Sequence, residues 1–359
     1  MSGAARTELK IGFMPLLDCA LLVVAHEVGM ARQQGLALRL LRESSWANIR
    51  DRVAIGHFDA AQMLVPMVVA ENLGLGHFKT PLVAPVALGT GGNAIIVSRE
   101  LWQAMQSFGA CAGAEPATQA RALAEVVKRR AAAGEAQLTL AMVFPFSCHN
   151  YELRDWLVSG GVDPDRDVRL VVLPPPLLVD ALRGGQVDGF CVGEPWNSLA
   201  VDAGIGVIAA VCSDVWPSPP EKVLGMRAGF AAENPDVVAR LVRAIHGAAM
   251  WAADASNHED LAQLLAQPRY VGAPARLMLA VLQGAIRHES GEPALLRPDF
   301  LKLGPSAIIP RTAYAELIHA RMQRWGQVTG DTSGLDRARA GFLEDGFRSV
   351  LAAAGVQAP

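Results

Sequence analysis

The sequence predicts a two-lobed α/β protein, because it is long enough for two cores, contains one internal duplication, and alternates short apolar strands with helices. Its 359 residues exceed the ~250–300 residues at which single hydrophobic cores stop growing. Hydrophobic residues make up 51% of the chain and charged residues 19%, a composition that excludes a disordered chain. The expected fold class is therefore α/β, with two α/β lobes and a ligand cleft between them.

The duplication relates residues 56–66, GHFDAAQMLVP, to residues 185–195, GQVDGFCVGEP. The two copies share a glycine, an aspartate and a proline at matching positions: Gly56, Asp59 and Pro66 in the first, and Gly185, Asp188 and Pro195 in the second. A helix-like run precedes each copy, so we expect each glycine to end a helix. We expect the aspartates to lie in turns or caps, not to act as catalytic acids.

The similarity continues upstream, where residues 10–29 resemble residues 139–161. Each segment reads as a short apolar strand, a proline, a few loop residues and an amphipathic helix. Further strands are expected at 36–42 and 168–173. The resulting order, strand–helix–strand–helix–strand, predicts a parallel sheet with right-handed crossovers in each lobe. Such sheets bind ligands at the carboxyl ends of their strands, where helix N-termini favour anions.

Long helices dominate the rest of the chain, and we expect them at 234–255, 277–286 and 312–325, with one more inside 110–137. The chain is expected to enter the second lobe near Ser98 and to return near Lys222. Lobe 1 then comprises residues 8–97 and 222–359, and lobe 2 residues 98–221.

Charge and apolar patterning exclude several classes of protein. The net charge is −3, and Lys and Arg are interspersed with acids, so we expect no direct contact with nucleic acid. The longest uncharged run, 80–98, is interrupted by prolines and glycines, so we expect no membrane span. The first residues, MSGAARTELK, lack the pattern of a secretory signal. We therefore expect a soluble, cytoplasmic protein.

The five cysteines are scattered without a CxxC motif or a metal-ligand spacing. An odd number of scattered thiols suits a reducing cytoplasm. From these patterns we expect no metal and no cofactor.

Five motifs, in order along the chain, carry a family resemblance: SSWANIRD (44–51), DAAQML (59–64), CHNYELRDWL (148–157), GEPWN (193–197) and PEKVLG (220–225). They closely resemble the nitrate-binding solute receptors of bacterial ABC transporters, and their signal-less cytoplasmic relatives, the NasS-type nitrate sensors. The resemblance implies a type II periplasmic-binding-protein fold. In the sensor branch it also implies control of nitrate-assimilation genes through an RNA-binding antiterminator partner, NasT-like.

Three residues of these motifs are candidate anion ligands. Lys222 lies where we place the return between lobes, and its ammonium would supply the positive charge that a monoanion needs; the alternative is a surface lysine. His149 stands where a loop meets a helix, and it either donates into the cleft or serves as a capping or core histidine. Trp46, at the matching junction of lobe 1, either forms a pocket wall or packs between lobes. The resemblance adds that bicarbonate-binding relatives carry an acid at the Lys222 position and recruit calcium, so lysine favours nitrate and no metal.

Weaker signals add further candidates. Gln62 and Asn93 are amide donors near strand ends. Gly193 follows a strand and is expected to open the next helix, so its backbone N–H could approach a ligand closely. Glu194 would repel an anion, and we expect it to pair with a cation or a helix N-terminus.

The sequence thus predicts a cytoplasmic sensor that binds nitrate or nitrite and releases its antiterminator partner on binding. One alternative is the solute-binding receptor of a nitrate ABC transporter. The other is an enzyme on the same fold, since relatives make thiamine-pyrimidine or menaquinone precursors. Motifs of common enzyme classes, such as GxSxG, the P-loop and HExxH, are missing from the sequence, and we expect no catalytic residues.

Overall fold

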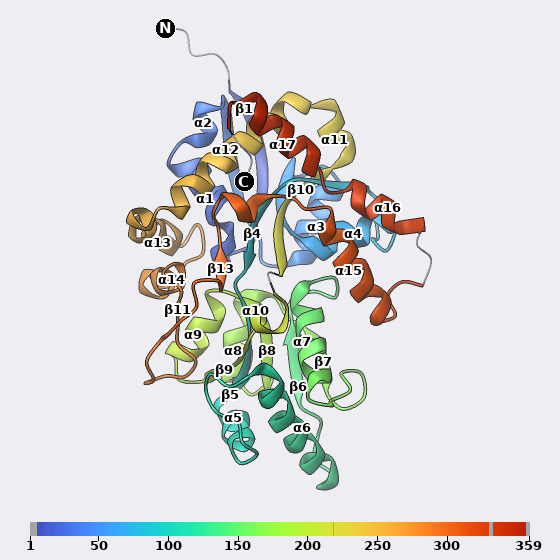
Figure 1. Cartoon of the computed structure of the whole chain (residues 1–359), viewed down its shortest axis with the longest axis vertical. Helices are drawn as coiled ribbons and strands as arrows, with labels where there is room; N and C mark the ends of the chain where they lie inside the picture. The colour runs from blue at the N-terminus through green and yellow to red at the C-terminus, as the bar shows by residue number, and fades with distance from the viewer. Residues whose placement is uncertain (1–5, 218, 330–332, 357–359) are drawn as a thin grey trace. The chain divides into compact units, whose positions relative to one another are not determined.

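The structure, a computed structural model, describes residues 6–217, 219–329 and 333–356 (Figure 1). It divides into two compact units. Unit 1 contains Met1–Thr90, Pro220–Gly272 and Lys302–Pro359, and unit 2 contains Gly91–Pro219 and Ala273–Leu301. Each unit is built around its own β-sheet, with helices on the faces of the sheet.

The unit boundaries differ from the expected lobes in two places. The first boundary comes earlier than expected, after Thr90, because β5 (Asn93–Ser98) pairs with two strands of unit 2. Residues 273–301 belong to unit 2, although we expected them in lobe 1. Their attachment is visible in the backbone, where the Ile208 N–H donates a 2.8 Å hydrogen bond to the His288 carbonyl. Helical periodicity alone does not show which sheet such a segment covers.

The sheet of unit 1 has the strand order β13-β4-β10-β3-β1-β2. Its strands are β1 (Thr7–Phe13), β2 (Leu36–Arg42), β3 (Ala60–Leu64), β4 (Leu82–Gly91), β10 (Pro220–Arg227) and β13 (Leu301–Lys302). β1 is parallel to both β2 and β3, whereas β10 is antiparallel to β3 and β4. A strand from the second half of the chain therefore lies inside this sheet, and it carries Lys222.

The main sheet of unit 2 has the order β7-β6-β8-β5-β9. Its strands are β5, β6 (Thr139–Met142), β7 (Arg169–Val172), β8 (Gly189–Gly193) and β9 (Gly206–Val211). β6 is parallel to β7 and β8, and β5 is antiparallel to β8 and β9. The series β2-β1-β3-β10-β4 and β7-β6-β8-β5-β9 share one plan, which confirms the duplication. A short hairpin-like pair, β11 (Ala285–Ile286) with β12 (Leu295–Leu296), also belongs to unit 2.

The repeated aspartates hold the same position in both copies. The Asp59 carboxylate accepts a hydrogen bond from the Lys10 N–H at 2.8 Å, and Asp188 accepts one from the Thr139 N–H at 2.7 Å. Each aspartate also donates its own N–H to the carbonyl of the same partner residue. The aspartates therefore join the third strand of each repeat to the first, a structural role, as expected, although neither caps a helix.

The glycines of the repeat also behave as expected. Gly56 has a φ of 79° and Gly185 a φ of 65°, and each follows the end of a helix. This left-handed conformation is accessible to glycine without the steric penalty of a Cβ atom. Both helices consequently turn sharply into the strands that contain the candidate ligands.

The helices of unit 1 are α1 (Ala20–Glu27), α2 (Met30–Gln33), α3 (Trp46–Ala54), α4 (Val65–Asn72), α11 (Ala228–Glu233), α12 (Pro235–Ala253), α13 (His258–Ala266), α15 (Ala313–Arg324), α16 (Ser333–Ala340) and α17 (Glu344–Ala353), with 3-10 turns η1 (Leu17–Cys19), η3 (Ala255–Asn257) and η4 (Pro305–Ile308). Those of unit 2 are α5 (Arg99–Gln106), α6 (Pro116–Ala132), α7 (Cys148–Ser159), α8 (Leu178–Arg183), α9 (Trp196–Asp202), α10 (Cys212–Val215) and α14 (Ala275–Leu282), with the 3-10 turn η2 (Pro175–Leu177). Within the described residues, no helix has both the length and the apolar character needed to cross a membrane.

The expected long helices are confirmed as α12, α15 and α6, with ends shifted by a few residues. The helix expected at 277–286 ends at Leu282, because Gly284 adopts a φ of 72° and Ala285 begins β11. A positive φ cannot continue a right-handed helix, so the periodic apolar residues beyond that point belong to a strand.

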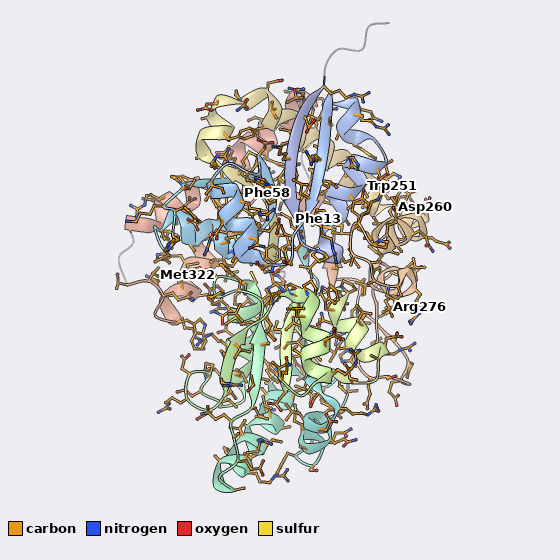
Figure 2. All side chains as sticks on the ribbon, turned by 180° about the vertical axis from the view of Figure 1, so that it is seen from behind. Phe13, Phe58, Trp251, Asp260, Arg276 and Met322 are labelled. Carbon is orange, nitrogen blue, oxygen red and sulfur yellow. The ribbon has the colours of Figure 1, made fainter. Side chains whose placement is uncertain are left out.

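Large aromatic side chains fill the interior of each unit separately. In unit 1, Phe13 and Phe58 are buried beside the parallel strands, and Figure 2 labels both. A methyl group added at Gly12 would overlap the Phe58 ring, so glycine is needed there for close packing. In unit 2, Trp102 and Trp156 lie in one core cluster, and the Trp156 indole N–H donates to the Pro116 carbonyl at 2.9 Å.

Candidate functional site

Lys222 is the centre of a buried charged cluster in unit 1. It lies on β10, in register with Leu64 on β3 and Gly89 on β4, and its side chain is 0% exposed. Its ammonium forms an ion pair with Asp18 at 3.0 Å and a second ion pair with Glu221. Lys222 is therefore not a surface lysine. The expectation that its positive charge is available for an anion needs revision, because two carboxylates already pair with the ammonium.

The three charges of this cluster shift one another's protonation. Burial alone would lower the pKa of Lys222, but Asp18 and Glu221 more than reverse this effect and hold its pKa above the usual value. Burial raises the pKa of Asp18, and the nearby Glu221 adds to this, although Lys222 opposes both. The lysine thus stays charged, while Asp18 takes up a proton more readily than an exposed aspartate.

Gln62 supports the cluster through Asp18. Its side-chain carbonyl accepts a 2.8 Å hydrogen bond from the Met14 N–H, and its amide N–H donates to the Asp18 carboxylate. Gln62 is fully buried on β3, beside the strand that carries Lys222. Its amide is therefore engaged with protein groups and holds Asp18 toward the lysine.

Trp46 forms one wall beside the lysine. It is the first residue of α3, whose N-terminus is capped by Ser45, a hydroxyl that accepts from the Asn48 N–H at 3.2 Å. The Lys222 ammonium lies 5.4 Å from the Trp46 ring centroid, within the range of a cation–π contact. The Trp46 indole N–H is buried and has no hydrogen-bond partner among the described residues. It is thus a donor that a ligand could satisfy.

Unit 1 therefore brings together three predicted residues, Trp46, Gln62 and Lys222. Sequence reasoning missed Asp18 and did not assign a role to Glu221. Asp18 had a usable signal, since it is the single charged residue between Ile11 and Ala25. An isolated acid within a buried apolar run needs a partner, and the partner comes from a distant strand.

In unit 2 the predicted residues gather around the carboxyl end of β8 and the start of α7. Asn93, the first residue of β5, is in register with Gly193, the last residue of β8. The Asn93 amide donates a 2.9 Å hydrogen bond to the carboxylate of Glu152, a buried residue of α7 that sequence reasoning did not single out. His149 lies one helical turn before Glu152 on α7 and is 0% exposed.

The open alternatives for His149 are narrowed by the helix cap. Ser147 caps α7, since its hydroxyl accepts from the Asn150 N–H at 3.1 Å. His149 is consequently not the capping residue. Two of the alternatives remain: a core histidine, or a ligand donor in the first turn of the helix.

Two expectations near the second-copy motif have different outcomes. Gly193 does not open a helix: it ends β8, and α9 begins only at Trp196. The turn at Glu194–Pro195, whose peptide bond is cis, separates the strand from the helix. Glu194 is buried, and its carboxylate accepts from the Ser198 N–H at 3.1 Å, which confirms the expected pairing with a helix N-terminus.

Burial controls the protonation of Glu194. It raises the pKa of this carboxyl to about 7, although hydrogen bonds from Ser198 and Asn197 oppose the shift. Near neutral pH the group is therefore partly neutral, and the repulsion that a carboxylate would exert on an anion is reduced accordingly.

Comparisons with known proteins identify relatives along most of the chain. The model of the NMT1-like family matches residues 2–266. The nitrate import ATP-binding protein NrtC of Synechocystis sp. is 39% identical over 274 residues, which cover 76% of this chain and 39% of NrtC. The nitrate/nitrite binding protein NrtA of Nostoc sp. is 29% identical over 356 residues, which cover 98% of this chain and 78% of NrtA. This chain thus spans well under half of NrtC.

A solved structure shows the same fold. The crystal structure of the periplasmic nitrate-binding protein NrtA from Synechocystis PCC 6803 matches with a TM-score of 0.88 and 26% identity, over 97% of this chain and 89% of that one. The match confirms the expected type II periplasmic-binding-protein fold with two α/β lobes, and these relatives confirm the part of the motif resemblance that concerns nitrate-binding receptors. The chain belongs to the NMT1-like family.

Proposed function

We propose that this protein binds nitrate or nitrite. The observation that carries the proposal is the complete burial of Lys222 against Trp46, in a chain similar to a nitrate/nitrite binding protein over 98% of its length. Burial of a lysine ammonium costs desolvation free energy unless carboxylates or a ligand pair with its charge. A planar, weakly hydrated anion suits a site lined by an indole and an ammonium.

Each unit, taken by itself, carries groups that we propose as anion ligands. In unit 1 we assign the Lys222 ammonium and the Trp46 indole N–H as donors. In unit 2 we assign the His149 ring, the Gly193 backbone N–H and the Asn93 amide, although this amide also donates to Glu152. Gln62 is assigned a supporting role, because its contacts to Met14 and Asp18 occupy its amide.

Charge balance favours a singly charged ligand. With both acids ionised, the cluster of Asp18, Glu221 and Lys222 is already negative, which opposes any anion. Protonation of Asp18, toward which burial biases it, removes one negative charge and lets Lys222 face the ligand. A dianion such as sulfate would leave a second charge unpaired in a buried place, so the site should reject it.

We further propose that the protein acts in the cytoplasm as a sensor that releases an RNA-binding antiterminator when the anion binds. The motif resemblance to NasS-type sensors supports this role, and five free cysteines suit a reducing compartment. The alternative, a receptor for a nitrate ABC transporter, is favoured by the likeness to a periplasmic NrtA. Neighbouring genes discriminate: permease and ATPase genes favour the receptor, an antiterminator gene the sensor.

Thermal unfolding of the full chain tests anion binding. Nitrate and nitrite should raise the melting temperature with concentration, because a ligand that binds only the folded state stabilises it by mass action. Sulfate, phosphate and bicarbonate at equal ionic strength should give no more than the chloride control. Stabilisation by sulfate or bicarbonate with indifference to nitrate and nitrite would overturn the proposal.

A further inference from the structure

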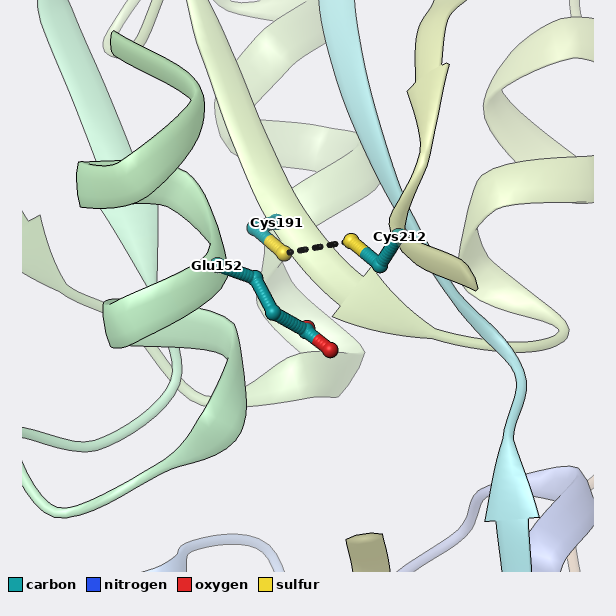
Figure 3. A group of neighbouring side chains, drawn as sticks. All are labelled: Glu152, Cys191 and Cys212. Atoms are coloured by element: carbon teal, nitrogen blue, oxygen red, sulfur yellow. Dashed lines mark hydrogen bonds between the residues drawn. The ribbon is translucent and has the colours of Figure 1, made fainter. Parts of the chain in front are cut away.

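Three ligand-type side chains converge inside unit 2, apart from the charged cluster of Lys222. Cys191 lies on β8, Cys212 begins α10 directly after β9, and Glu152 projects from α7 (Figure 3). All three are 0% exposed. One potential ligand atom from each lies within 4.8 Å of the others, and the two sulfurs are 3.7 Å apart.

The sheet topology separates the backbones of the two cysteines. β5 lies between β8 and β9, and Ile95 on β5 is in register with both Cys191 and Ala210. Two strands that flank a third are about 9–10 Å apart, since neighbouring strands are spaced by about 4.8 Å. A disulfide requires Cα atoms within about 7 Å, so this frame does not favour one.

The distance between the sulfurs instead matches two ligands of one metal ion. Sulfurs bound at about 2.3 Å to a tetrahedral zinc ion lie about 3.8 Å apart. Their separation here is 3.7 Å, with a carboxylate on the same side to supply a third ligand (Figure 3). The Asn93 amide donates to this carboxylate at 2.9 Å, the kind of outer hydrogen bond that orients a metal ligand.

We propose that Glu152, Cys191 and Cys212 bind one Zn²⁺ ion within unit 2, with a water molecule as the fourth ligand. This site differs from the expectation of no metal, which was based on cysteines that are far apart in the chain and form no CxxC motif. Thiolates select zinc over calcium and magnesium, which prefer oxygen ligands. The three zinc ligands are not among the residues assigned to the anion, although Asn93, one of those residues, contacts Glu152.

Proton balance sets the conditions for binding. Burial raises the pKa of Cys212 well above its usual value, and both Cys191 and Glu152 add to this. Without metal the Cys212 thiol is therefore held in its protonated form. Binding of Zn²⁺ replaces the two thiol protons, which pass to the buffer, and leaves two thiolates on the metal. Metal affinity should consequently increase with pH.

The test uses the full chain, stripped with a chelator, kept reduced and titrated with Co²⁺ as a spectroscopic substitute for zinc. We expect one equivalent of Co²⁺ to produce the strong near-ultraviolet charge-transfer band of a thiolate-bound ion, and Zn²⁺ to displace it. The band should disappear in Cys191→Ser and Cys212→Ser. It should persist in two control variants, Cys19→Ser, a buried cysteine of unit 1, and Cys111→Ser, an exposed one.

The outcome on the unaltered chain is decisive even if a variant fails to fold. Absence of a thiolate band at saturating Co²⁺, or a band that survives in folded Cys191→Ser and Cys212→Ser, overturns the proposal. A band lost only in Cys111→Ser overturns it too, because the metal then binds at the surface thiol. Retention of one tightly bound zinc per chain after purification, measured by elemental analysis, supports it.

Discussion

Lys222 shows how a single residue can be recognised from a motif and still be misjudged in its charge. The motif resemblance singled out this lysine, and its complete burial excludes the alternative of a surface lysine. Its carboxylate neighbours, Asp18 and Glu221, could not be foreseen, because the pairing of residues 18 and 222 depends on where β10 enters the sheet of unit 1. Local sequence patterns predict where strands form. Which charged side chains form ion pairs depends on how strands from distant parts of the chain are placed in the sheet.

Replacement of Lys222 by alanine should destabilise the protein even without ligand. Removal of one partner leaves two buried carboxylates without a counter-charge, a loss of about 3–5 kcal/mol in the free energy of unfolding. Urea denaturation followed by tryptophan fluorescence measures this loss. Lys128→Ala, at an exposed lysine paired with Glu125, is the control and should change stability by about 0.5 kcal/mol or less. Equal, small effects in both variants would mean that the buried cluster is not held by its charges.

Asp18→Asn should strengthen nitrate binding. The amide keeps the size of the side chain and removes one negative charge from Lys222, so the affinity should rise about tenfold, or about 1.4 kcal/mol. In the unaltered protein the affinity should increase as the pH falls, because Asp18 then gains a proton, and this dependence should be weaker in the variant. Isothermal titration calorimetry across a pH series measures both effects. A folded variant that no longer binds nitrate would show that the carboxylate itself is required.

At the scale of elements, the features that could be predicted are those that the internal duplication repeats with the same residue types. Gly56 and Gly185 end helices because only glycine tolerates the required φ without strain, and Asp59 and Asp188 each tie a strand to its neighbour. The first three strands of each repeat are parallel, as expected, but the sheets are mixed and not purely parallel, because β10 and β5 run antiparallel to their neighbours. Residues 273–301 were misplaced, since an amphipathic segment carries no information about which of two sheets it covers.

Glu194, in the link between β8 and α9, predicts that the free energy of unfolding depends on pH. The folded-state pKa of Glu194 is raised from 4.5 to about 7, so the native state binds its proton more tightly than the unfolded chain does. The stability that this proton contributes is complete below about pH 4.5 and is lost as the pH rises toward 7. The loss amounts to at most about 3 kcal/mol, at 1.36 kcal/mol per pKa unit.

Glu194→Gln should remove this dependence, because glutamine resembles the neutral acid. Unfolding free energies measured by urea denaturation between pH 4.5 and 8 should fall less steeply in the variant than in the unaltered protein. Glu259→Gln is the matched control, an exposed glutamate in the first turn of α13, and should leave the slope unchanged. Parallel pH profiles for the Glu194 variant and the unaltered protein would contradict the assignment.

For the whole molecule, the motifs predicted the fold because they lie at strand–helix junctions that the duplication repeats. A surface that binds a partner protein has no repeated sequence pattern of this kind. Nitrate and an antiterminator partner must nevertheless be coupled if the protein is a sensor. A ligand can release a partner only if it binds the partner-free protein more tightly, and the partner must weaken nitrate binding by the same factor. This reciprocity does not depend on where the partner binds, and it can be measured from either side.

The last prediction tests this coupling with a purified RNA-binding antiterminator, the partner proposed above. The complex formed without anion should dissociate in size-exclusion chromatography when nitrate or nitrite is added, and chloride should have no effect. In the reverse direction, saturating partner should raise the apparent nitrate dissociation constant, by about 5–150-fold for a coupling of about 1–3 kcal/mol. Lys222→Met/Glu221→Gln, which removes the ammonium without leaving Glu221 charged beside the gap, should form the complex but no longer release it. A complex of the unaltered proteins that persists at saturating nitrate and nitrite would eliminate the sensor mechanism and leave anion binding intact, because the thermal shift by nitrate requires no partner.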